Sequence, residues 1–131
     1  MVNRFIKALG ATVLVTVAVI ASPGVANASA GGSTSTALGT LSQYTVGDSY
    51  HVGRVEAGVA SGYRCDIGFM VTGTLKNGQG YSSAKWASCS SNPSYTFTIN
   101  QEFKADTRLC VSVRTRAGSW LPDKACIWIE A

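Results

Sequence analysis

The sequence has one histidine, His51, in 131 residues, and no second long apolar run follows the one that ends at residue 21. A single histidine excludes a metal site built from several histidines. A Ser-His-carboxylate triad would have to use His51, yet the chain lacks the G-x-S-x-G motif that often carries such a serine. We therefore expect His51 to be a polar residue of an edge strand.

Acidic residues are also few, seven in all. Asp66, Asp106 and Asp123 flank expected strands and turns, where aspartate is common for conformational reasons. None of the seven lies in a recognisable motif of a carboxylate pair that hydrolyses glycosides. We assign no catalytic residue, no metal ligand and no cofactor, and we expect the chain not to be an enzyme.

The N-terminus has the order of a secretory signal peptide. Arg4 and Lys7 precede an uncharged apolar segment at 8–21, and small residues follow Pro23. The apolar segment is shorter than the roughly twenty residues that a membrane span needs, so a retained anchor is the less favoured alternative. We predict a signal peptide at 1–28, with cleavage after Ala28 or, alternatively, after Ala30. This N-terminal pattern resembles those of exported proteins from high-GC Gram-positive bacteria.

Without residues 1–28 the chain keeps nine basic and seven acidic residues, a net charge of +2. Nucleic-acid binding usually needs a concentrated basic stripe, and an anionic membrane attracts a polybasic cluster. The sequence has neither. We therefore expect no nucleic-acid partner and no membrane contact once the signal peptide is removed.

The rest of the chain predicts one small all-β domain at 41–131, preceded by a flexible Gly/Ser/Thr tail at 29–40. Apolar residues alternate with polar ones, and glycine-rich turns recur about every ten residues, which is typical of an antiparallel β-sandwich or small barrel. We expect a small antiparallel β-sandwich of the immunoglobulin or fibronectin type III kind, or a similar one. The expected strands are 41–46, 50–57, 65–75, 81–89, 94–100, 107–115 and 124–130.

The four cysteines are Cys65, Cys89, Cys110 and Cys126. No two of them are within four residues of each other, so the close-pair spacing of a structural zinc site is missing. An even number of cysteines in an exported chain predicts two disulfides and hence a secreted, extracellular protein.

Residues that face each other in an antiparallel hairpin have a constant sum of residue numbers. Cys110 and Cys126 sum to 236 and centre on Gly118, while Cys65 and Cys89 sum to 154 and centre on Asn77, next to Gly78. Glycine and Asn-Gly are turn signals, and facing residues lie about 4.5–5.5 Å apart, within reach of a disulfide. We therefore predict one disulfide in each hairpin.

The rival pairing joins Cys65 to Cys110 and Cys89 to Cys126, as an inter-sheet bridge of an immunoglobulin domain would. It is less favoured because Arg108 stands where the tyrosine two residues before the second cysteine is expected.

The same arithmetic assigns faces in the last hairpin. Leu109, Val111 and Val113 should face the core, and Arg108 should lie opposite Trp128 on the outer face. In the first hairpin, Trp86 falls on the outer face unless a bulge near Gly80 turns it inward, and the sequence does not decide between these alternatives.

The final hairpin, with its motif VSVRTRAGSW at 111–120, resembles the last hairpin of fibronectin type III domains over about twenty residues. The resemblance implies a sandwich fold. The four cysteines and the absent tyrosine corner depart from that family.

Two groups of residues are candidate binding sites. The turn at 116–123 carries Arg116, Trp120 and Leu121, which have the composition of an interface anchor, although Trp120 could instead fold back over the open end of the sandwich. Tyr81 and Trp86, with Tyr63, Arg64 and Lys85, form a second candidate surface, whose alternative is ordinary cross-strand packing.

We therefore expect a secreted, non-catalytic binding protein whose partner is an extracellular protein or glycan. The first alternative is an inhibitor of an extracellular hydrolase, a protease or an amylase, that inserts the loop at 116–122 into the target's cleft. The second is a small cell-wall- or carbohydrate-active protein.

Overall fold

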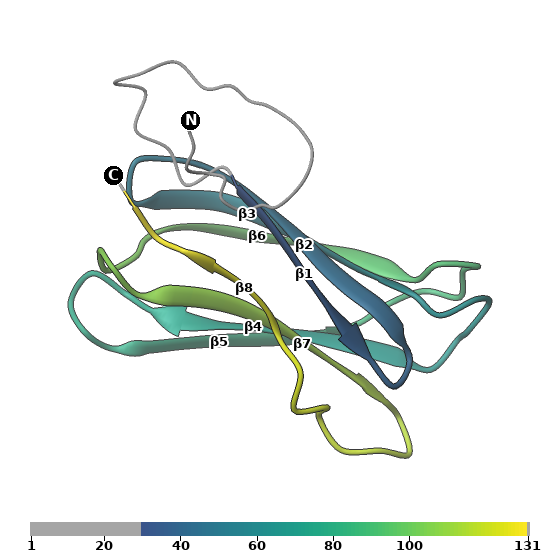
Figure 1. Cartoon of the computed structure of the whole chain (residues 1–131). Helices are drawn as coiled ribbons and strands as arrows, with labels where there is room; N and C mark the ends of the chain where they lie inside the picture. Colours follow the sequence, from purple (N-terminus) through teal and green to yellow (C-terminus); the bar gives the residue numbers. More distant parts are fainter. Residues whose placement is uncertain (1–29, 131) are drawn as a thin grey trace.

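The computed structural model describes residues 30–130, which form two four-stranded antiparallel sheets with no helix (Figure 1). The predicted signal peptide therefore lies outside the described residues, apart from the alternative cleavage site after Ala30. The eight strands are β1 (Ala30–Thr36), β2 (Gly39–Asp48), β3 (His51–Ala60), β4 (Ile67–Thr74), β5 (Gly80–Trp86), β6 (Ser94–Glu102), β7 (Arg108–Thr115) and β8 (Ala125–Trp128).

One sheet has the order β1-β2-β3-β6 and the other has the order β5-β4-β7-β8. Figure 1 shows them as two stacked layers, with β1 of the first sheet running close to β8 of the second. The predicted all-β class with two disulfides is confirmed. Within residues 30–130, no helix has the length and apolar character of a membrane span.

Strand β1 contradicts the predicted flexible tail. Residues 30–36 pair along their whole length with β2, from Ala30 opposite Thr45 to Thr36 opposite Gly39. A Cβ on Gly32 would lie 2.5 Å from the carbonyl oxygen of Cys126, so only glycine lets β1 approach β8 this closely. The small residues of this segment therefore reflect tight packing of the backbone rather than flexibility.

Both predicted hairpin registers are present. β4 and β5 pair without a register shift, so that Gly68 faces Trp86, and in the second hairpin Arg108 faces Trp128. The absence of a bulge leaves Trp86 on the outer face. The guanidinium of Arg108 lies 6.0 Å from the centroid of the Trp128 ring, which fits the predicted cation–π contact.

The disulfides are Cys65–Cys89 and Cys110–Cys126, and the described residues include no free cysteine. Each bridge links the two arms of one hairpin, and the inter-sheet alternative is wrong. Two disulfides of this kind are typical of extracellular proteins.

The core lies between the two sheets. Its largest fully buried side chains include Phe69, Phe103, Leu41 and Ile67. Leu109, Val111 and Val113 are also fully buried, as the face assignment predicted.

One buried polar side chain joins the two sheets. Gln43 on β2 is only 4% exposed, and its Nε2 donates hydrogen bonds to the carbonyl oxygens of Leu109 and Ala125 at 2.9 and 2.7 Å. The hydroxyl of Thr45 donates to Oε1 of Gln43. The amide of Gln43 is therefore satisfied in the interior, as a buried polar group must be if it is not to destabilise the fold.

Candidate functional site

Three loops meet at one end of the sandwich: 61–66, 87–93 and 116–124. The first two are joined by a β-bridge between Arg64 and Ser90 and by the Cys65–Cys89 disulfide. The third is tied to the first because the backbone N–H of Arg116 donates to the carbonyl oxygen of Asp66 at 3.0 Å. Residues beyond the strand ends are therefore held in place at this end of the molecule.

Trp86 closes strand β5 and lies over the backbone of β4. A Cβ added to Gly68, its cross-strand partner, would stand 2.7 Å from the ring, so the indole occupies the space that any other side chain would fill. Trp86 nevertheless remains 43% exposed. The pairing of these two residues thus fixes a tryptophan on the outer face of the sheet.

Arg114 stands next to Trp86 in the same row across the sheet, because Gly68 pairs with Trp86 on one side and with Arg114 on the other. Its guanidinium carbon is 5.5 Å from the ring centroids of both Trp86 and Trp120. Its Nε and one terminal nitrogen donate to the carbonyl oxygens of Thr115 and Arg116. Arg114 therefore connects the two tryptophans and fastens the start of the third loop.

Arg116 also lies over the ring of Trp86, with its guanidinium carbon 4.3 Å from the ring centroid. Cation–π contacts of this kind are worth about 0.5–1 kcal/mol when exposed. We call Trp86, Arg114, Arg116 and Trp120 together the Trp–Arg surface.

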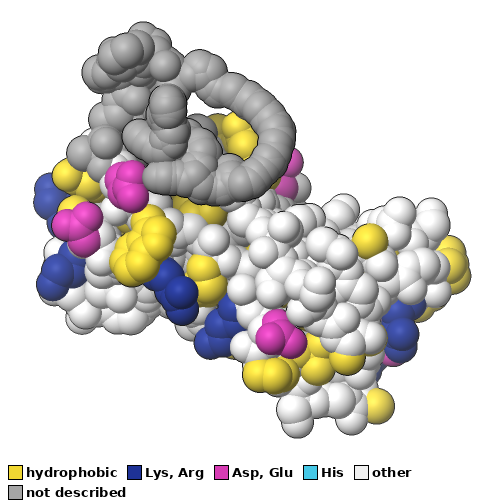
Figure 2. All heavy atoms as spheres, in the orientation of Figure 1, with side chains coloured by type: hydrophobic (Ala, Val, Ile, Leu, Met, Phe, Trp, Pro, Cys, Tyr) yellow, Lys and Arg dark blue, Asp and Glu magenta, His cyan; other side chains and the backbone are white. Residues whose placement is uncertain are grey.

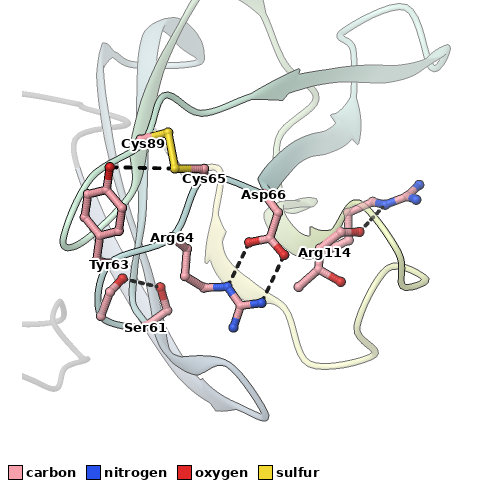
Figure 3. Close-up of polar contacts among 9 residues, drawn as sticks. Ser61, Tyr63, Arg64, Cys65, Asp66, Cys89 and Arg114 are labelled. Carbon is pink, nitrogen blue, oxygen red and sulfur yellow. Dashed lines mark hydrogen bonds and ion pairs between the residues drawn. A yellow bond between two sulfur atoms is a disulfide. The ribbon is translucent and has the colours of Figure 1, made fainter.

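Arg64 and Asp66 form a bidentate ion pair beside this surface (Figure 3), with Nε and a terminal nitrogen of Arg64 at 2.8 and 3.0 Å from the carboxylate oxygens. The hydrogen bonds from Arg64 hold the pKa of Asp66 below its usual range, and the positive charges of Arg64 and Arg116 act in the same direction. The pKa of Arg64 is correspondingly raised by its bond to Asp66. The carboxylate of Asp66 thus stays ionised while its backbone carbonyl holds Arg116.

Tyr63 is the most exposed large hydrophobic side chain of this end, with 71% of its surface accessible. Its hydroxyl lies 3.7 Å from Sγ of Cys65, to which it can donate a weak hydrogen bond (Figure 3). The ring therefore stands at the disulfide and adds an aromatic group beside the ion pair of Arg64 and Asp66.

The structure brings together three of the five predicted binding residues. Trp86, Trp120 and Arg116 belong to one surface, although the sequence placed them in two groups. Leu121 follows Trp120, but it is partly buried against the core. Tyr81 lies near the opposite end of β5, where its ring makes an edge contact with Phe103 at 5.5 Å between centroids. Phe103 follows β6 of the other sheet, so Tyr81 packs against the core between the two sheets rather than across the β4–β5 pair.

Arg114 was not among the predicted binding residues. Its position beside Trp86 depends on the pairing of β4 with β7, which are not neighbours in the chain. The hairpin arithmetic does not extend to such a pair. With the order of the strands known, the alignment of Trp86, Gly68 and Arg114 across β5, β4 and β7 would have identified Arg114.

The structure also locates His51 and the residues of the types that could bind a metal ion. His51 begins β3, which is an interior strand between β2 and β6, so the expected edge position is wrong. Within residues 30–130, no group of three or more His, Cys, Asp or Glu side chains is arranged to hold a metal ion.

An open groove of about 520 Å³ lies between β1 and the segment 122–124. Its lining is polar, with Arg108 and Lys124 beside Asp123.

Comparison with known proteins gives no family. The chain matches no protein-family model, no curated protein and no solved structure.

Proposed function

We propose that the chain is a secreted, non-catalytic binding protein that contacts an extracellular partner through the Trp–Arg surface. The observation that carries the proposal is the stacking of Arg116 on the half-exposed Trp86, beside Arg114 and Trp120, on a sheet held by two disulfides. Tryptophan, tyrosine and arginine are the residues most enriched at energetically dominant interface positions.

The surface is also held in place before any partner arrives. Arg114 bonds two backbone carbonyls, Asp66 holds the backbone of Arg116, and Trp86 rests on Gly68. Groups that are already ordered lose less conformational entropy on binding. On the face drawn in Figure 2, hydrophobic side chains form small patches among charged ones, which suits a soluble protein with a local binding surface.

Export is part of the proposal. The signal-peptide pattern at 1–28 and the two disulfides favour an extracellular bacterial protein. We also propose that the sandwich is of the immunoglobulin or fibronectin type III kind. The chain crosses from one sheet to the other between β3 and β4, β5 and β6, and β6 and β7, as Greek-key sandwiches do.

The test is retention of extracellular material on the immobilised protein, residues 29–131, with two double variants. Trp86→Ala/Arg116→Gln removes the proposed contact. Trp128→Ala/Arg108→Gln removes an Arg–Trp contact elsewhere on the same sheet and serves as the matched control. We expect the wild type and the control to retain the same protein or glycan from culture medium or cell wall, and the first variant to lose it. Equal retention by all three proteins would refute the proposed site.

An inhibitor of an extracellular hydrolase is the second candidate, and the geometry of the third loop favours it. The segment 116–119 is exposed, and hydrogen bonds from Gly118 to Thr115 and from Leu121 to Val113 brace it on both sides. Proteases and amylases should be assayed with an excess of the protein. Inhibition that is lost when the segment 116–119 is replaced by a glycine-serine linker would support this role, and unchanged rates throughout would exclude it for the enzymes assayed.

A further inference from the structure

We propose that the partner of the Trp–Arg surface is a protein that presents a carboxylate-rich segment, which Arg116 binds through its guanidinium. This inference rests on the proposed function and adds the chemistry of the ligand. It follows from the number of charged side chains at this end of the molecule and from which of them already have partners.

Basic groups are concentrated at this end. The described chain has nine basic and seven acidic residues, yet three arginines, Arg64, Arg114 and Arg116, surround Trp86 and Asp66. Asp66 neutralises Arg64, and it is the acidic group recorded against these arginines. This end therefore carries more positive charge than the nearly balanced charges of the whole described chain would suggest.

The three arginines differ in how many of their guanidinium N–H groups already have a partner. Arg64 is engaged with Asp66, and Arg114 donates to the carbonyl oxygens of Thr115 and Arg116. Within residues 30–130, the guanidinium of Arg116 has no hydrogen bond and no ion pair, and its recorded contact is the face of Trp86. Its N–H groups are therefore available to a ligand.

Stacking prepares Arg116 for one class of ligand. A guanidinium that lies against an aromatic ring keeps its N–H groups at its edge, where they match the two oxygens of a carboxylate. Its contact with Trp86 and the backbone bond to Asp66 both limit how far it can move. A bidentate bond to a carboxylate can therefore form at a reduced entropic cost.

The same contacts argue against a neutral sugar. Sugar rings stack on bare aromatic faces, but here the guanidinium of Arg116 lies over the ring of Trp86, and Gly68 of β4 packs against the same ring. Trp120 is half-buried against Arg114. The surface thus offers guanidinium edges rather than open rings.

The surroundings favour a protein as the source of the carboxylates. Tyr63 is 71% exposed next to the ion pair, and exposed tyrosine and tryptophan with arginine are enriched in protein interfaces. An anionic membrane would be held by a larger cluster of lysines and arginines. An acidic polypeptide segment that lies across Arg116, with its apolar atoms against Tyr63, uses both of these groups.

Binding of poly-L-glutamate, measured by tryptophan fluorescence and calorimetry at low salt, tests the inference. Arg116→Gln and Arg108→Gln each remove one charge and one Arg–Trp contact, so they match in net charge. We expect Arg116→Gln to weaken binding by about tenfold, the loss of one charge-assisted bidentate contact. We expect Arg108→Gln to stay within about twofold. Arg116→Lys, which keeps the charge without the planar fork, should fall between wild type and Arg116→Gln.

Equal losses in Arg116→Gln and Arg108→Gln would show attraction by net charge alone and would overturn the inference. So would tighter binding of polygalacturonate, which carries its carboxylates on sugar rings, or no binding of poly-L-glutamate at all. In that last case, retention of extracellular material that depends on Trp86 and Arg116 would leave the proposed function standing. Unchanged circular dichroism and thermal midpoints of the three variants confirm that each folds.

Discussion

At the scale of single residues, the Trp–Arg surface depends on the absence of a side chain at Gly68. Gly68 is fully covered by the ring of Trp86, and a Cβ there would meet two ring atoms at 2.7 and 2.8 Å. Trp86 then gives Arg116 a ring to stack on. Glycine at position 68 is therefore required for the position of the Trp86 ring and for its contact with Arg116.

Gly68→Ala should displace the ring of Trp86 and separate it from Arg116. Overpacking at such a position costs about 1–3 kcal/mol. We expect a lower urea midpoint and greater quenching of tryptophan fluorescence by acrylamide. Gly80→Ala on the neighbouring strand β5 is the control, because its Cβ would meet nothing within 4 Å. Equal behaviour of the two variants would contradict the packing described for Trp86.

The ion pair of Asp66 makes a pH-dependent contribution to stability. Because Arg64 lowers the pKa of Asp66 in the folded state, this contribution is present above the unfolded pKa of about 3.9 and is lost as the pH falls through the lower folded value.

Asp66→Asn should therefore have a lower thermal midpoint than wild type at neutral pH, by a small amount because the pair is accessible to solvent. The difference should vanish in strong acid. Asp123→Asn, at a carboxylate without an ion pair in the described chain, is the control. A deficit of Asp66→Asn that stays constant down to strong acid would speak against the ion pair as its cause.

Gln43 is the residue whose loss should most affect the interior. Gln43→Met leaves the carbonyl oxygens of Leu109 and Ala125 and the hydroxyl of Thr45 without this partner. We expect the free energy of unfolding in urea to fall by about 2–4 kcal/mol, from buried groups that lose hydrogen bonds. Gln101→Met on the exposed side of β6 should change it by less than about 0.5 kcal/mol. Similar values for both variants would refute the role given to Gln43.

At the scale of elements, hairpins could be predicted and distant pairings could not. The positions of Gly118 and Asn77 and the spacing of four cysteines were enough for both registers, both disulfides and the pair of Arg108 and Trp128. The pairing of β4 with β7 joins segments about forty residues apart, and no turn encodes it.

The first strand shows another limit of the sequence. The segment AGGSTST has no alternating apolar pattern, and none of its residues is fully buried. It is held by a backbone ladder to β2 and by the close approach of Gly32 to Cys126. A pattern-based prediction detects burial of side chains, so it interprets such a strand as a tail.

Removing one hairpin disulfide should weaken the fold without changing it. For Cys110→Ala/Cys126→Ala, where the sequence separation is 16, we expect a loss of about 3 kcal/mol in the free energy of unfolding. The near-ultraviolet circular dichroism should stay that of the wild type below the transition. A double variant as stable as wild type would show that the bridge does not restrain the unfolded chain.

At the scale of the whole molecule, the fold explains why residues from distant segments share one site. Strand β5, the end of β7 and the loop at 116–124 meet at the same end of one sheet, and the loop at 61–66 ties them together. Residue types alone identified Trp86, Trp120 and Arg116 as candidates. Their union, and the addition of Arg114, required the order of the strands.

The three tryptophans permit a direct test of this site, because Trp86 and Trp120 belong to the Trp–Arg surface and Trp128 lies apart on β8. In nitrogen-15 NMR spectra each indole N–H gives its own signal, and poly-L-glutamate can be titrated into the mature protein. We expect the signals of Trp86 and Trp120 to shift while that of Trp128 stays in place. Movement of the Trp128 signal alone, or of none of the three, would contradict this expectation.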